Sequence, residues 1–197
     1  MDERARRLVR LSALVVLGDW DGLTALRAAA PEGEPDRAWR EVVLQSHLFA
    51  GFPRLIEAYE VLGAAGGLGE PDPDEHEGQG SFEPRGAALF ERIYGDNTES
   101  VQARLASFHP DYQRWIAEHA YGRVLSRPGL GADVRELCAV AALFALGQDR
   151  QLASHARGAV RCGVPPGVVA EVPGLDEDLV PQARAERGRV VLSRFAR

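Results

Sequence analysis

Residues 135–163 (RELCAVAALFALGQDRQLASHARGAVRCG) constrain the fold more than any other part of the sequence. Before Gly147, apolar residues recur at the i, i+3, i+4 and i+7 spacing that places them on one face of a helix. These residues are Leu137, Val140, Ala141 and Phe144, and the same spacing returns in Leu152, His155, Ala156 and Ala159. Gly147 favours a turn, and Gly163 stands where a helix C-cap is expected. The stretch therefore predicts two short helices folded back on each other.

Two polar residues, Glu136 and His155, interrupt the apolar character of this predicted pair. They lie at about 16 Å and about 12 Å from the turn, at ~1.5 Å per residue, and packed helices lie ~8–10 Å apart. We therefore expect the two side chains to meet between the helices. A carboxylate beside an imidazole in a low-dielectric groove is suited to general acid–base catalysis. The alternative is a buried hydrogen bond that only fixes the two helices.

The rest of the sequence also follows helical spacing, and no alternating run is bounded by hairpin turns. We predict an all-α fold, with a break in the chain at Gly51 and Pro53. Outside residues 135–163, helices are expected over residues 4–18, 19–30, 37–49, 53–62, 87–94, 100–107, 110–123 and 166–172, and a last one within 175–197.

Residues 63–84 separate the two helical parts, residues 1–62 and 85–197. This linker is rich in Gly, Pro and acidic residues, so we expect it to be exposed and mobile. His76 lies among the acidic residues, where a solvated charged loop is favoured over a metal site. No metal is predicted, and the two halves are expected to form one compact unit.

The sequence also contains an internal similarity. Residues 7–42 can be aligned with residues 135–172, and Gly18 then matches Gly147. Such a repeat predicts two related helical units that pack on each other, whereas chance similarity between Leu- and Ala-rich helices is the alternative.

The aligned halves differ at the two polar positions. Arg7 and Leu26 of the first copy stand where the second has Glu136 and His155. A pair needed for the fold itself would be expected in both copies. After this comparison, the catalytic and the purely structural interpretations of the Glu136–His155 pair are equally favoured.

The composition narrows the classes of function. The formal charge of −6 and the absence of a basic stripe argue against nucleic-acid binding. No apolar run is long enough for a membrane span, and no signal peptide is recognised, so a cytoplasmic protein is expected. Cys138 and Cys162 match neither a metal pattern nor a redox pair, although a disulfide between them stays open.

Residues 107–172 contain motifs that resemble the carboxymuconolactone decarboxylase family, whose wider group includes the alkylhydroperoxidase D proteins. The motifs are HPD at 109–111, YG at 121–122, SRPGL at 126–130, REL at 135–137, His155, Gly163 and EV at 171–172. Residues 41–62 are similar to the next helices of the family, including Gly51 and Pro53. The family pattern is thus spread over two tandem copies.

The resemblance implies an AhpD-like helical bundle that forms homo-oligomers and needs no cofactor. In the peroxidase branch a Glu and a His flank a CxxC pair, and Glu136 and His155 match these flanks. Gln148 and Gln151 stand at the two cysteine positions, so the thiolate nucleophile and its partner are missing. The resemblance therefore favours decarboxylase chemistry over peroxide reduction.

The resemblance also implies a role for each of five residues. His155 would move a proton, and Glu136 would orient it and raise its pKa. Arg127 would bind a substrate carboxylate, unless it is a capping or ion-pair arginine. His119 and Tyr121 would line the cleft, unless they are core residues.

Three hypotheses on function result. The first is a cofactor-free decarboxylase or lyase that acts on a small carboxylated lactone or enol. The second is a non-catalytic helical oligomer, which predicts that Glu136 and His155 are sealed from solvent. An antioxidant protein of the alkylhydroperoxidase type has the least support.

Overall fold

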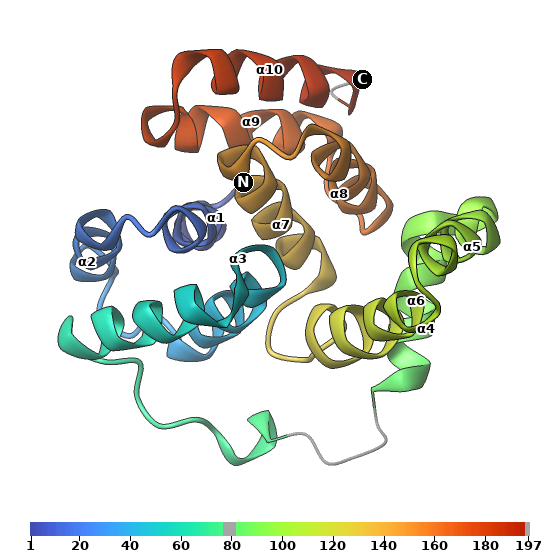
Figure 1. Ribbon diagram of the computed structural model, residues 1–197. Coiled ribbons are helices and arrows are strands. Elements are labelled where there is room, and N and C mark those ends of the chain that lie inside the picture. The colour runs from blue at the N-terminus through green and yellow to red at the C-terminus, as the bar shows by residue number, and fades with distance from the viewer. Residues whose placement is uncertain (77–81, 196–197) are drawn as a thin grey trace.

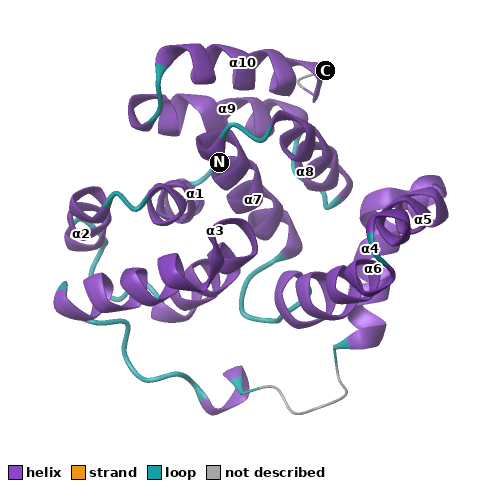
Figure 2. Ribbon diagram, in the orientation of Figure 1, coloured by secondary structure: helices purple, strands orange, loops and turns teal. Residues whose placement is uncertain are grey.

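The computed structural model describes residues 1–76 and 82–195, and every regular element among them is helical (Figures 1 and 2). The predicted all-α fold is therefore confirmed. The α-helices are α1 (Glu3–Leu17), α2 (Trp20–Ala28), α3 (Asp36–Ala64), α4 (Glu83–Tyr94), α5 (Thr98–Phe108), α6 (Pro110–Trp115), α7 (Ala132–Leu146), α8 (Asp149–Arg161), α9 (Pro166–Asp176) and α10 (Gln182–Leu192). Within the described ranges, no helix combines the length and the hydrophobicity needed to cross a bilayer.

Helix α7 lies at the centre of the fold (Figure 1). Residues 135–145 are buried on all sides, as expected for a helix that is apolar around most of its circumference. Helices α1 and α3 pack against α7, as do α8, α9 and α10. Residues from both sides of the linker thus contribute to one main core. The tail joins it through Ala185, Val191 and Leu192 of α10.

Helices α1 and α7 end in the same way. Gly18 and Gly147 follow them with φ of 71° and 68°, in the left-handed region that favours glycine. A short helix starts after each glycine, as the sequence alignment of the two halves predicts. The tandem repeat itself stays a prediction.

Two segments differ in detail from the sequence prediction. Helix α3 runs through residues 36–64, and the expected break is a kink at Gly51, with φ 78° and ψ 170°. The predicted helix over 110–123 is divided into α6 and a π-helix, η3 (Ile116–Leu125). The wider π-helical turn is uncommon and is often found at functional sites.

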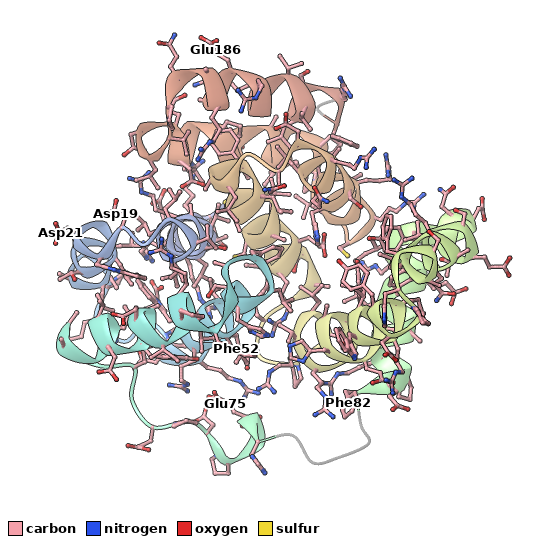
Figure 3. All side chains as sticks on the ribbon, viewed as in Figure 1. Asp19, Asp21, Phe52, Glu75, Phe82 and Glu186 are labelled. Carbon is pink, nitrogen blue, oxygen red and sulfur yellow. The ribbon has the colours of Figure 1, made fainter. Side chains whose placement is uncertain are left out.

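Most of the described linker residues are exposed, although parts of the segment pack on the fold. Residues 63–64 continue α3, and Leu68 is buried against the main core. Glu75, labelled below α3 in Figure 3, forms an ion pair with Arg40 of α3. The burial of Leu68 and the ion pair of Glu75 therefore hold part of the linker against the fold. Residues 77–81 lie outside the described residues.

A second apolar cluster lies beside the main core. It is formed by Leu89, Phe90, Ile93, Ala120, Tyr121, Leu125 and Cys162. Helix α4 approaches η3 closely, since a Cβ on Gly86 would lie 2.6 Å from the Cα of Gly122. Only glycine fits at this contact. The candidate site described below lies between the two clusters.

Asp176, at the end of α9, is a buried acid of the main core. Among the described residues, neither of its carboxylate oxygens has a hydrogen-bond partner. Burial raises its pKa to about 7, against the opposing effect of Arg10, whose Nη1 lies 3.9 Å from Oδ1. An unfolded Asp titrates near pH ~3.9. Between these values only the folded chain holds the proton, so stability falls as the pH rises from about 4 to about 7.

Replacing Asp176 with Asn is therefore expected to stabilise the protein at high pH. The advantage in free energy of unfolding should grow by about 2 kcal/mol between pH 5 and pH 8, because the buried charge is removed. Urea unfolding at the two pH values measures this change. Asp178→Asn is the control: its hydrogen bond to Arg10 lowers the pKa of Asp178, so its loss should destabilise the protein at pH 8. An Asp176→Asn advantage independent of pH would refute the account.

Candidate active site

Glu136 and His155 meet between α7 and α8. Nδ1 of His155 donates a hydrogen bond to Oε2 of Glu136 at 2.9 Å. The turn at Gly147 folds α8 back along α7 and so brings the two side chains together. The contact predicted from helix spacing is therefore confirmed, whereas the roles of the two residues are considered below.

The glycine at position 158 makes room for this contact. A Cβ on Gly158 of α8 would lie 2.4 Å from Oε2 of Glu136. Any larger residue at this position would displace the carboxylate or α8. The local sequence of α8 thus supports the observed position of Glu136.

The surroundings of His155 favour its charged form. Burial on its own lowers the pKa of His155, but the charge and the hydrogen bond of Glu136 more than compensate, and the pKa is raised above 6.5. Since Nδ1 is bonded to Glu136, Nε2 is the nitrogen left for a ligand. No residue in the described part of the chain forms a hydrogen bond with Nε2.

His155 lines a pocket of about 510 Å³ between the main core and the second cluster. Helices α3, α4, α5, α6, η3, α7 and α8 all contribute to its wall. The side chain of Glu136 is 2% exposed and that of His155 is 16% exposed. The pair is therefore not sealed between the helices, contrary to what the non-catalytic hypothesis predicts.

Phe49 brings the first half of the chain to this site. Its ring lies edge-on to that of His155, with 5.9 Å between the ring centroids. Leu48 and Phe49 of α3 both line the pocket, just before the kink at Gly51. The sequence did not single out these two residues, although the position of Phe49 before a Gly-x-Pro break was visible.

Tyr121 lines the same pocket, as expected from the sequence. Its hydroxyl group donates a hydrogen bond to the hydroxyl oxygen of Tyr94, at 3.0 Å, and Tyr94 also lines the pocket. Burial raises the pKa of Tyr121 well above 10, so the side chain stays a neutral phenol. Tyr94 was not predicted, because it lies in another helix 27 residues away.

His119 does not line the pocket of His155. It lies on η3 beside His47 of α3, with 2.8 Å between the two Nε2 atoms. Burial, His47 and Arg123 lower the pKa of His119. Tyr121 and His119 are two residues apart on η3, and only Tyr121 faces the pocket.

Arg127 is also absent from the wall of this pocket. Its Nε and Nη2 donate hydrogen bonds to Glu41, the shortest at 3.0 Å, and Nη2 also donates to the carbonyl oxygen of Glu75. Nη2 of Arg135 binds the same carboxylate of Glu41 at 2.6 Å. Of the two roles considered for Arg127, the ion-pair role is the observed one. Its position does not support binding of a substrate carboxylate beside His155.

Glutamines stand where the peroxidase branch would have its thiols. Gln148 and Gln151 line the pocket near His155. Cys138 and Cys162 are free and buried, and burial raises the pKa of the two thiols to about 12 and about 11. Neither cysteine is in a state that favours a nucleophilic thiolate.

Comparison with known proteins agrees with this geometry. Residues 110–189 match the sequence model of the carboxymuconolactone decarboxylase family. The match covers less than half of the chain, and over these residues the chain is similar to the carboxymuconolactone decarboxylase family. The matched region includes Glu136 and His155, and the resemblance seen in the sequence is confirmed.

The chain is also similar to two known proteins. It is 34% identical over 91 residues to a 4-carboxymuconolactone decarboxylase from Acinetobacter baylyi, covering 46% of this chain and 65% of the relative. It is also 30% identical over 129 residues to peroxisomal protein 2 from Schizosaccharomyces pombe, covering 63% of this chain and 60% of the relative. The chain thus spans less than two thirds of the length of either relative.

Proposed function

We propose that the protein is a cofactor-free acid–base enzyme that decarboxylates a small carboxylated lactone or enol. One observation carries the proposal: His155 is hydrogen-bonded to Glu136 through Nδ1 and lines a pocket with its ring. The identity to the 4-carboxymuconolactone decarboxylase supports this class of reaction.

The proposed step balances with the residues at the site. The bond between the carboxylate carbon and the ring breaks, CO₂ leaves, and the electron pair passes to the lactone carbonyl as an enolate. The protonated Nε2 of His155 then donates its proton to the carbon that lost CO₂. Solvent returns a proton to His155, while Glu136 holds the ring and stabilises the imidazolium.

The apolar wall of the pocket assists this step. Leu, Val and aromatic side chains solvate a carboxylate poorly, so burying its charge among them is unfavourable. Neutral CO₂ carries no charge and can lie there without this cost. Transfer of the charge from the carboxylate to the delocalised enolate, followed by its neutralisation by the proton of His155, is therefore favoured there. His155 remains the one titratable imidazole that lines this pocket among the described residues.

The competing interpretation is a helical oligomer without catalytic activity. The position of Arg127 supports this interpretation, because its side chain forms an ion pair with Glu41 and does not line the pocket of His155. The partial exposure of His155 in a pocket favours the enzyme instead. The homo-oligomer and the cytoplasmic location stay predictions, and light scattering after gel filtration tests the first.

A panel of unsaturated lactones carrying one or two carboxylates tests the proposed function. We expect the purified protein to release CO₂ from at least one of them, with the product protonated at the carbon that lost the carboxylate. Deuterium from D₂O should appear at that carbon. No CO₂ release from any of them would overturn the proposal.

A further inference from the structure

We propose that the pocket of His155 takes a ligand with an apolar, ring-sized body and at most one negative charge, which faces His155. This inference names the substrate class of the proposed function and rests on it. It also limits that class, because ligands with charges at both ends are excluded.

The chemistry of the wall is the first observation. Of its fifteen residues, nine are aliphatic or Phe, three are Tyr, two are Gln and one is His. Within the part of the chain that the structure describes, the wall has no Arg, Asp or Glu. A carboxylate buried without a cation or enough hydrogen-bond donors is strongly disfavoured. His155 is the one group on this wall that can carry a positive charge, and it already shares that charge with Glu136, so a second ligand carboxylate has no cation.

The polar groups are also unevenly distributed. Gln148, Gln151 and His155 are spaced by three and four residues, so they share one face at the start of α8. By contrast, α5 contributes only Val101 and Leu105 to the wall. A ligand with one polar end and one apolar end matches this arrangement.

The size of the pocket suits a ring-sized apolar body. About 510 Å³ falls within the ~300–1,000 Å³ of pockets that bind drug-sized molecules. The rings of Phe49 and Tyr112 on the wall suit contact with a flat aromatic or unsaturated ring. The hydroxyl of Tyr94, which accepts a hydrogen bond from Tyr121, still has its own proton for a ligand oxygen.

Three probes test the inference by isothermal titration calorimetry: neutral coumarin, 2-naphthoate with one charge, and naphthalene-2,6-dicarboxylate with a charge at each end. We expect coumarin and 2-naphthoate to bind, and the dicarboxylate to bind at least tenfold more weakly than 2-naphthoate. Equal or tighter binding of the dicarboxylate would overturn the inference, as would the failure of both coumarin and 2-naphthoate to bind.

A variant of a residue on the pocket wall tests whether the probes bind in this pocket. Gln148 is an exposed residue on the wall, so Gln148→Arg adds a cation there without disturbing the core. It should strengthen dicarboxylate binding about tenfold and change coumarin binding less than twofold. Gln182→Arg is the matched control, because Gln182 is exposed on α10, the helix that carries the labelled Glu186 in Figure 3. An equal effect of the two variants, or no effect of Gln148→Arg, would contradict the inference.

The failure of the inference and that of the proposed function are distinguishable. The probes report binding without turnover. If they bind in the expected order and no lactone releases CO₂, the function is wrong and the pocket chemistry stands. If a dicarboxylated lactone is turned over and the dicarboxylate probe binds tightly, the inference is wrong and the function stands.

Discussion

Replacing His155 with Gln is expected to lower turnover of a carboxylated lactone by about 10²–10⁴-fold, the usual contribution of a general acid or base. Glutamine keeps a polar side chain of similar reach, but its amide protons are not acidic enough to protonate the carbon that lost CO₂. The effect should fall mainly on kcat, because the proton donor is lost, and KM should also rise, because His155 faces the charge of the substrate. Initial rates of CO₂ release over a range of substrate concentrations separate kcat from KM.

Two further variants complete this test. Glu136→Gln keeps a hydrogen-bond acceptor for Nδ1 but removes the negative charge, so it should lower kcat less than the loss of His155. His76→Gln changes an exposed histidine of the linker and should leave the rate unchanged. Wild-type turnover in His155→Gln would eliminate His155 as the proton donor.

Replacing Glu41 with Met is expected to destabilise the fold by about 3–5 kcal/mol, the range for removing one partner of a buried ion pair. Glu41 is 2% exposed and accepts hydrogen bonds from Arg127 and Arg135, and Arg135 is only 1% exposed. Without Glu41, the buried guanidinium of Arg135 loses its counter-charge. Urea unfolding gives the change in free energy.

The double variant Glu41→Met, Arg135→Met is the control for this prediction. It removes the two most buried charges of the network and leaves Arg127, which is 14% exposed and still donates to the carbonyl oxygen of Glu75. Apolar replacement of a buried pair is often neutral. We therefore expect it to be more stable than Glu41→Met alone. If the single variant loses less than about 1 kcal/mol, the ion-pair network does not stabilise the interior as described.

The sequence was most informative where local rules decide the structure. Helical spacing around Gly147 predicted α7, the turn and α8, because a glycine can adopt the left-handed conformation that ends a helix. Once the turn was placed, the axial positions of Glu136 and His155 followed from the helical rise. Their 2.9 Å contact was therefore predictable without any knowledge of the rest of the fold.

The sequence was least informative where partners come from distant segments. Glu41 lies 86 residues from Arg127, and no local pattern indicates that the two form an ion pair. Tyr121 faces the pocket and His119 does not, since residues two apart on a helix lie on different faces. The spacing could not predict which of the two faces the pocket, because that depends on how η3 packs against the other helices. The wall of the pocket, assembled from seven helices, was accessible only from the structure.

The pKa of His155 is the measurement that tests the central claim most directly. NMR titration of the imidazole nitrogens would follow wild type and Glu136→Gln. The account predicts a His155 pKa above 6.5 in wild type, because Glu136 raises it despite burial, and a lower value in the variant. A wild-type pKa below 6.5, or one that does not change in Glu136→Gln, would contradict the account of a paired proton donor in the pocket.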